Sequence, residues 1–259
     1  MRVLVLCSGG KDSAYATWWS LMRGWDVAGM VTIRVTGSDS MMFQVPSTAL
    51  AGLQAASAGI PWLPIPIYGE EDTEIEQLQQ ALEGVVKGSR KQRSTIWSAD
   101  ELDAMEWPES WTWPEELARL RPSQPIDALV VGALRSDYQK TRIERMCHRL
   151  GIKSFCPLWH HDGIKHMRDL VEHNHQVMMT SVTSDGLGEE WLGRVLNLDH
   201  INRLEQLADK FRFHIDGEGG EFETAVLDAP WMSRTIQTQQ TPHWTGRRGW
   251  LDIWAAELV

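Results

Sequence analysis

The chain has 259 residues, 42% hydrophobic and 23% charged, which predicts one large domain or a moderate one with a smaller companion, and no membrane span. Its net charge of -10 would repel a phosphate backbone, so we expect no direct nucleic-acid partner. The three cysteines include no Cys-x-x-Cys pair, which favours a reducing compartment, so we expect a cytoplasmic location.

The first half of the chain alternates short β-rich apolar runs with helical patterns. The predicted strands are Val3 to Cys7, Val27 to Ile33, Trp62 to Ile67 and Ala128 to Gly132. The predicted helices that follow them are Asp12 to Arg23, Ser47 to Ala58, Thr73 to Val85 and Ser136 to Leu150. This alternation predicts an α/β domain over residues 1–152, built as a doubly wound parallel sheet with flanking helices.

The segment from Gly88 to Pro125 interrupts this rhythm and has the character of an insertion. It begins with basic residues and continues with four tryptophans among acids and prolines: Trp97, Trp107, Trp111 and Trp113. So many aromatic residues argue against simple disorder. We expect a small helical subdomain whose tryptophans pack on one another, in preference to a partner-binding surface.

Residues 153–259 have a different pattern, which predicts a smaller α+β domain for the substrate. Its predicted elements are a helix from Gly163 to His173, a strand from Gln176 to Val182 and a helix from Asp199 to Phe211. A glycine-rich acidic turn follows. The tail from Val226 to Val259 is expected to form extended segments, with turns at residues 228–230 and 245–247.

The strongest chemical signal is the run Ser8-Gly9-Gly10-Lys11-Asp12-Ser13, between the first predicted strand and helix. A helix N-terminus at the carboxyl end of a strand offers free N–H groups and a positive dipole to an anion. The glycines let the backbone approach, the serine hydroxyls can donate hydrogen bonds, and Lys11 adds a cation. The alternative is a plain turn with Asp12 as helix cap, which the strand–loop–helix placement disfavours.

The loop is not of the Walker type, because its glycines are adjacent and an acid follows the lysine. A carboxylate beside a polyphosphate is repelled unless a divalent cation lies between them. Asp12 therefore predicts a Mg²⁺ ion at this loop. We expect Asp12 to be its ligand and to be essential for catalysis.

This loop resembles that of the ATP pyrophosphatase superfamily, whose HUP-like fold uses it to hold the pyrophosphate end of ATP. The resemblance implies that ATP binds here and that its α-phosphorus is attacked, so that pyrophosphate leaves. The residues expected to contact ATP are Ser8, Gly9, Gly10, Lys11, Asp12, Ser13, Gly132, Ser136, Asp137 and Tyr138.

Three further stretches narrow the resemblance: Gly132 to Arg142, Gly186 to Arg194 and Gly217 to Thr224. Together they resemble the diphthine–ammonia ligase family over nearly the whole chain outside the tryptophan-rich segment, and the compact length resembles its archaeal form. The resemblance implies ATP-dependent amidation of the diphthine carboxylate on translation elongation factor 2, through an acyl-adenylate, to give diphthamide, AMP and pyrophosphate. The implied partners are the elongation factor and free ammonium, with a homodimer left open.

Polar residues follow the fourth predicted strand, at the sheet edge where nucleotides bind. Capping of the next helix explains Ser136 and Asp137. It gives no reason for Gln139 and Arg142, which are candidates to hold phosphate or the activated carboxylate. We therefore predict catalytic roles for Gln139 and Arg142.

Three acids lie on and after the glycine-rich turn, and the implied substrate carries a quaternary ammonium group. Glu218, Glu221 and Glu223 either attract that cation or position ammonia as a base would, and we predict that they are catalytic. Trp159 and Trp191 are candidates for a cation–π contact with the trimethylammonium head, worth about 0.5 to 2 kcal/mol. Core packing is the favoured alternative for both tryptophans.

Two features depart from the family pattern. Gln44 stands where many relatives have a histidine, and it cannot titrate near neutrality. An acid–base role at that position is therefore in doubt. The second departure is the insertion after Val85, which either alters recognition of the protein substrate or decorates the surface.

Two other functions stay open. A tRNA-modifying or sulfur-transfer enzyme would use the same loop, but Cys147 lies in a helical apolar rhythm typical of a buried thiol, and the acidic balance disfavours RNA. A non-catalytic adenine-nucleotide sensor would keep the loop and have no use for the acids at residues 218–223.

Overall fold

The structure is a computed structural model of the whole chain, and it describes residues 1–36, 45–68, 74–89, 94–132 and 137–259. For residues 35–36, 45–47, 68 and 137–139 only the backbone is described. The predictions for Gln44 and Ser136 fall outside the described residues. No helix in the described part of the chain is long and apolar enough to cross a membrane.

Five parallel strands form the first sheet, in the order β3-β2-β1-β4-β5. Their bounds are β1 Arg2–Leu6, β2 Asp26–Thr36, β3 Trp62–Tyr68, β4 Ala128–Val130 and β5 Lys153–Phe155. The helices of this half are α1 Lys11–Met22, α2 Val45–Ala58, α3 Glu74–Val86, α4 Ala99–Met105 and α5 Asp137–Leu150. The predicted doubly wound α/β fold is confirmed.

Both faces of this sheet are covered by helices, which explains the continuous apolar run of β1. Val3 and Val5 point into a cluster with α1 and α2, whereas Leu4 points into a second cluster with α3 and α5. All three side chains are fully buried. The strand order reverses between β1 and β4, so the loops that follow these two strands face the crevice where such sheets bind ligands.

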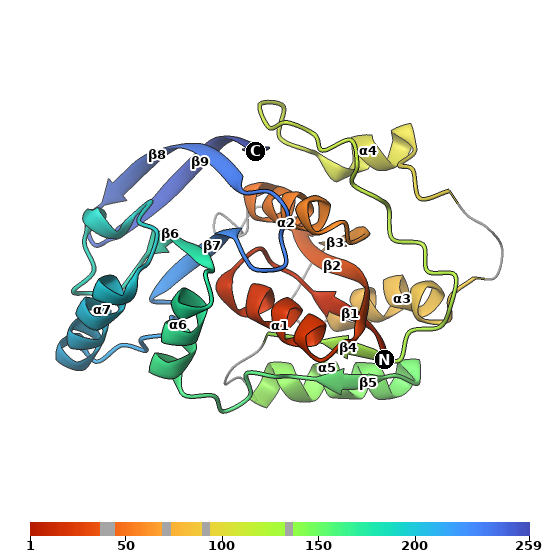
Figure 1. Cartoon of the computed structure of the whole chain (residues 1–259), viewed down its shortest axis with the longest axis horizontal. Helices are drawn as coiled ribbons and strands as arrows, with labels where there is room; N and C mark the ends of the chain where they lie inside the picture. The colour runs from red at the N-terminus through yellow and green to blue at the C-terminus, as the bar shows by residue number, and fades with distance from the viewer. Residues whose placement is uncertain (37–44, 69–73, 90–93, 133–136) are drawn as a thin grey trace.

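The second sheet is antiparallel, in the order β7-β6-β9-β8. Its strands are β6 Gln176–Val182, β7 Phe222–Asp228, β8 Ile236–Thr245 and β9 Arg248–Leu258. The helices α6 Gly163–Glu172 and α7 Leu198–Phe211 and a short 3₁₀ turn η1 Glu189–Trp191 accompany it. Figure 1 shows this sheet beside the parallel one, with α1 and α2 towards it. The predicted smaller α+β unit is present.

Helix α2 packs between the two sheets. Its Ala51 and Ala55 belong to the cluster against the parallel sheet, while Leu50 and Leu53 pack on the antiparallel sheet beside Ile253. Every side chain from Thr48 to Ser57 is buried, as expected of a helix that is covered on all sides. The two halves of the chain therefore share an apolar interface.

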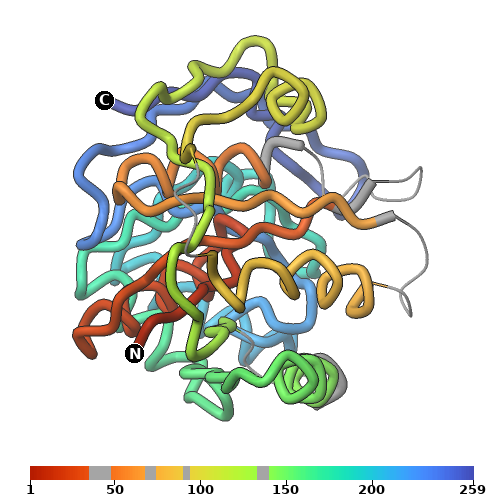
Figure 2. The backbone as a smooth tube through the Cα atoms, turned by 90° about the vertical axis from the view of Figure 1, so that its right-hand side faces the viewer, coloured from red at the N-terminus to blue at the C-terminus, as the bar shows by residue number. Residues whose placement is uncertain are grey.

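The tryptophan-rich segment is folded and packs on β3. The rings of Trp107 and Trp113 meet edge to face with their centroids 4.9 Å apart. The ring centroids of Trp97 and Trp62 lie 5.9 Å apart. Trp111 donates from Nε1 to the Ile253 carbonyl at 3.2 Å, so the segment also contacts β9. Figure 2 shows it running beside the C-terminal strands. The expectation that these tryptophans pack on one another is confirmed, but the described part of the segment has one short helix, α4, in place of the expected helical subdomain.

Candidate active site

The loop between β1 and α1 has the geometry of an anion site. Gly9 has φ +86°, a left-handed conformation that favours glycine. The Ser13 hydroxyl donates to the Gly10 carbonyl at 3.0 Å and accepts from the Ser8 amide at 3.3 Å. The first helical bond runs from Ala14 N to Gly10 O. The amides before Ala14 make no bond within the helix, so the start of α1 has the form of the helix N-terminus at which phosphate binds in such folds.

The C-terminal half of the chain completes this loop through the edge strand β7. The Val226 amide donates to the Gly9 carbonyl at 2.9 Å, and the Lys11 amide donates to the Thr224 hydroxyl at 3.2 Å. Gln54 of α2 donates to both the Gly9 and Val226 carbonyls, at 2.9 and 2.7 Å. Gln54 and Thr224 were not among the predicted site residues. An amide side chain in a helix rich in alanine and leucine is the signal that marks Gln54.

Asp12 lies between two nitrogen donors. Its Oδ2 accepts from Lys11 Nζ at 2.8 Å, and its Oδ1 lies 2.8 Å from Nε2 of His166 on α6. Burial acts to raise the pKa of Asp12, but Lys11 and His166 hold it below its ordinary value. Burial likewise acts to lower the pKa of Lys11, and the charge of Asp12 raises it above its ordinary value. Asp12 is thus held as a carboxylate.

A magnesium ion fits the donor chemistry of this loop. Asp12 offers hard carboxylate oxygens, and its side chain is 24% exposed. The described residues contain no cluster of three or more His, Cys, Asp or Glu side chains arranged for a metal. Mg²⁺ commonly binds through one or two carboxylates together with substrate phosphates, so a single acid is sufficient here. The role of Asp12 as metal ligand stays a prediction.

Gly132, which follows β4, packs directly against the start of α1. A Cβ at this position would lie 2.6 Å from the carbonyl carbon and oxygen of Asp12 and 2.9 Å from the Ser13 amide. Only glycine permits this approach. Gly132 therefore shapes the loop through backbone packing, a reason that the sequence did not reveal.

Helix α5 follows in the chain and carries the other predicted residues of the segment. The backbone of Asp137, Tyr138 and Gln139 forms its first turn, and Arg142 follows one turn later, partly buried. Because β1 and β4 are neighbours, the N-termini of α1 and α5 face the same crevice. The contact of these residues with a nucleotide stays a prediction.

The three predicted acids have different surroundings. Glu221 accepts from the His214 amide at 2.8 Å and the Gly219 amide at 2.7 Å, so its carboxylate stabilises its own turn. The charge of Glu218 acts on Lys11 and raises the pKa of that lysine. Desolvation of its carboxylate raises the pKa of Glu223. The charge of Lys11 acts to lower this pKa, and the charge of Asp12 acts to raise it. Glu218 and Glu223 therefore act on the loop electrostatically, whereas the structure gives Glu221 a role in the turn.

The two tryptophans proposed for cation binding already have other partners. Trp191 is 1% exposed and belongs to the core under α7, with the Arg203 guanidinium 5.4 Å from its ring centroid. It cannot reach a substrate, which confirms core packing for Trp191. Trp159 is partly buried, and Lys140 Nζ lies 4.9 Å from its ring centroid.

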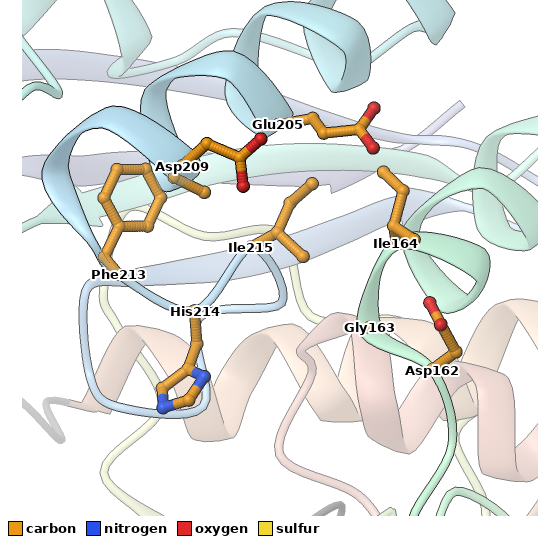
Figure 3. A pocket seen from close by; sticks show the side chains of 9 residues that line it. Asp162, Gly163, Ile164, Glu205, Asp209, Phe213, His214 and Ile215 are labelled. Atoms are coloured by element: carbon orange, nitrogen blue, oxygen red, sulfur yellow. The ribbon is translucent and has the colours of Figure 1, made fainter.

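A separate cavity of about 320 Å³ lies between α6 and α7 (Figure 3). Its walls combine acidic and apolar side chains: Asp162, Ile164, Glu205, Asp209, Phe213 and Ile215. The carboxylate of Asp162 caps α6 by accepting from the Lys165 amide at 3.0 Å. None of the residues from Ser8 to Ser13 lines this cavity.

Stability should fall on acidification because of His175, which is 3% exposed and packs its ring on Trp18. Burial lowers the pKa of His175 from 6.5 to about 4. In the unfolded chain His175 therefore binds a proton below pH 6.5, whereas in the folded chain it stays neutral down to about pH 4. Each pH unit between these two pKa values lowers the free energy of unfolding by ~1.4 kcal/mol, so up to about 3 kcal/mol of stability is lost as the pH falls through this window. Denaturant unfolding should show that the free energy of unfolding of His175→Gln depends less on pH between 6.5 and 4 than that of the wild type. An unchanged pH dependence would contradict the assignment of this effect to His175.

The fold and the loop define an α/β protein whose first helix begins at the crevice where sheets of this kind bind phosphate groups. Two family models match the chain: "Diphthamide synthase N-terminal domain" over residues 1–96 and 109–154, and "Diphthamide synthase C-terminal domain" over residues 162–259. The chain belongs to the diphthamide synthase family, and its activity is that of a ligase that forms a C–N bond. Residues 97–108 and 155–161 fall outside both models, and the extent of the insertion stays a prediction.

Curated relatives agree with this family. The diphthine–ammonia ligase of Homo sapiens is 29% identical over 244 residues, covering 91% of this chain and 82% of the relative. That of Schizosaccharomyces pombe is 30% identical over 241 residues, covering 91% of this chain and 36% of the relative. These relatives are eukaryotic, so likeness to the archaeal form stays a prediction.

A solved structure titled as a predicted subunit of tRNA methyltransferase from Methanocaldococcus jannaschii covers 89% of this chain and 98% of its own. Its TM-score is 0.36 at 16% identity, too low to support a conclusion.

Proposed function

We propose that this chain converts the diphthine carboxylate of translation elongation factor 2 into its amide, using ATP, Mg²⁺ and free ammonium. The observation that carries the proposal is the β1–α1 loop, completed by β7 and placed where the strand order reverses. Family membership supplies the reaction class. The cytoplasm, where the elongation factor acts, is the proposed location.

The chemistry follows from holding the two terminal phosphates of ATP. A carboxylate oxygen of diphthine attacks the α-phosphorus, and the bond to the departing pyrophosphate breaks. Ammonia nitrogen then attacks the acyl carbon, and AMP leaves with the electron pair of the C–O bond. Lys11, the Ser8 and Ser13 hydroxyls and the amides of α1 bind the leaving pyrophosphate. Mg²⁺ held by Asp12 would neutralise its charge.

The acids near the loop are proposed to act in the second step, the attack of ammonia on the acyl carbon. Ammonium must lose a proton before its nitrogen can attack. The pKa of Glu223 is raised by desolvation of its carboxylate and by the nearby charge of Asp12, which makes it a better proton acceptor than a glutamate of ordinary pKa. Glu218 adds negative charge beside Lys11. We assign proton acceptance to Glu223 and attraction of cations to Glu218. Gln139 and Arg142 are proposed to hold the activated carboxylate.

We place the domain boundary between β5 and α6. The fifth strand of the parallel sheet ends at Phe155, three residues beyond the boundary predicted at 152, and the C-terminal family match starts at residue 162. The residues after this boundary are proposed to bind the elongation factor, since β7 carries Glu223 to the nucleotide loop.

Sulfur transfer is disfavoured by the thiols. Burial is the main cause that raises the pKa of Cys147 to about 12, and burial also raises the pKa of Cys156. A nucleophilic sulfur must be a thiolate, so neither thiol is activated near neutral pH. A carboxylate acceptor needs no thiol.

The direct test is incubation with ATP, Mg²⁺, ammonium and diphthine-bearing elongation factor, followed by mass spectrometry of the modified peptide. Conversion of a carboxylic acid to an amide lowers the mass by about 1 Da. The expected result is this decrease, dependent on both ATP and ammonium. No decrease with a verified substrate would refute the proposed function.

A further inference from the structure

A histidine from the C-terminal half contacts the acid of the phosphate loop. His166 lies on α6, 154 positions from Asp12 in sequence, and its Nε2 is 2.8 Å from Asp12 Oδ1. The His166 side chain is fully buried. Asp12 accepts at its other oxygen from Lys11. The carboxylate is thus held between a donor of its own loop and a donor of the other half of the chain.

The remaining contacts of His166 fix its ring in one orientation. Tyr15 of α1 packs edge to face on it, with centroids 5.0 Å apart at 82°. Its Nδ1 is buried, and no described residue is hydrogen-bonded to it. The contact with Asp12 is thus the ring's only hydrogen bond within the described residues. Since a carboxylate can only accept, Nε2 carries the proton.

We infer that His166 is a positioning residue for Asp12, and that it makes the geometry of the ATP loop depend on docking of the C-terminal half. This inference rests on the proposed function. A carboxylate with one partner can rotate about χ2, whereas a second partner on the opposite side fixes both oxygens. Groups that orient a metal ligand commonly change metal affinity or activity by about 10- to 100-fold when they are removed.

The competing explanation is a buried histidine that only fills space, and His175 provides the matched control. It is equally buried, follows α6 closely and packs on Trp18 of the same helix α1. Its Nδ1 faces the Leu170 carbonyl at 3.2 Å, so it belongs to local structure. His175→Gln therefore measures the effect of replacing a buried histidine that does not touch the loop.

The experiment compares His166→Leu, His166→Gln and His175→Gln at pH 8. His166→Leu removes the donor, while glutamine places an amide N–H near the position of Nε2. We expect His166→Leu to lower kcat/KM for ATP and raise the half-saturating Mg²⁺ concentration by about 10- to 100-fold, with KM for ammonium unchanged. His166→Gln should recover most of this loss, and His175→Gln should match the wild type. Equal losses in His166→Gln and His166→Leu, or a parallel change in KM for ammonium, would overturn the inference.

A second readout does not depend on turnover. Long-range ¹H–¹⁵N correlation spectra of the unliganded protein should show the His166 proton on Nε2, and Asp12→Asn should shift that nitrogen. A proton on Nδ1 alone would overturn the inference. If the wild type does not amidate diphthine yet shows this signature, the proposed function fails while the positioning role of His166 stands.

Discussion

Replacing Asp12 with asparagine is expected to lower turnover at least about 100-fold while the chain stays folded. Asparagine keeps an oxygen that can accept from His166, but it loses the charge that attracts Mg²⁺. The loss should exceed that of a supporting partner such as His166. Pyrophosphate release with saturating ATP and substrate measures the effect. Turnover near that of the wild type would contradict the role of Asp12 as metal ligand.

Stability has to be measured in parallel, because Asp12 is also the counter-ion of Lys11, which is only 5% exposed. Removing one member of a buried ion pair costs about 3 to 5 kcal/mol. The cost should be smaller here, since the Asp12 side chain is 24% exposed and the charges of Asp216 and Glu218 also act on Lys11. Asparagine is a better replacement than alanine because it keeps an oxygen that can accept from His166. Thermal unfolding of the variant should show one cooperative transition.

Gly132→Ala is expected to weaken ATP binding by about tenfold or more, a free-energy change of about 1.4 kcal/mol. The new Cβ would lie 2.6 Å from backbone atoms of Asp12, which cannot move aside as a flexible side chain would. The start of α1 must shift, and its amides must shift with it. Overpacking of this kind also costs about 1 to 3 kcal/mol of folding stability. Calorimetric titration with ATP and Mg²⁺ measures the affinity.

Gly84→Ala is the matched control for this substitution. Gly84 lies in α3, and a Cβ there would have no atom within 4 Å. Alanine in a helix should stabilise the chain by about 0.5 to 1 kcal/mol and leave ATP binding unchanged. Tight ATP binding by a folded Gly132→Ala variant would show that the loop does not need its contact with the β4 segment.

Most of the fold could be predicted from local patterns, because most elements carry their own sequence signal. Strand β6 has the predicted bounds Gln176–Val182, and α1 begins one residue before the prediction. Strand β5 was missed, since its three residues carry too little periodicity. The start of α4 was not predicted, although Ser98 and Glu101 have the spacing of a capping box and form one in the structure.

The composition of the site was less predictable, because its contacts join distant parts of the chain. The phosphate loop is a contiguous motif and could be found from sequence. His166 lies 154 positions from its partner, and Gln54 lies 172 positions from Val226. The signal for His166 is its place among Gly163, Met167 and Leu170 on the buried face of α6. That spacing indicates burial, but it does not identify Asp12 as the partner.

The identity of the nucleotide product shows which phosphorus of ATP is attacked. The loop is proposed to hold the two terminal phosphates, which leaves the innermost phosphorus open to attack. A single turnover with ATP labelled at the α-phosphate and verified diphthine-bearing substrate should yield labelled AMP, with one pyrophosphate for each amide formed. Labelled ADP together with inorganic phosphate would show that a different bond breaks, and would rule out attack on the α-phosphorus.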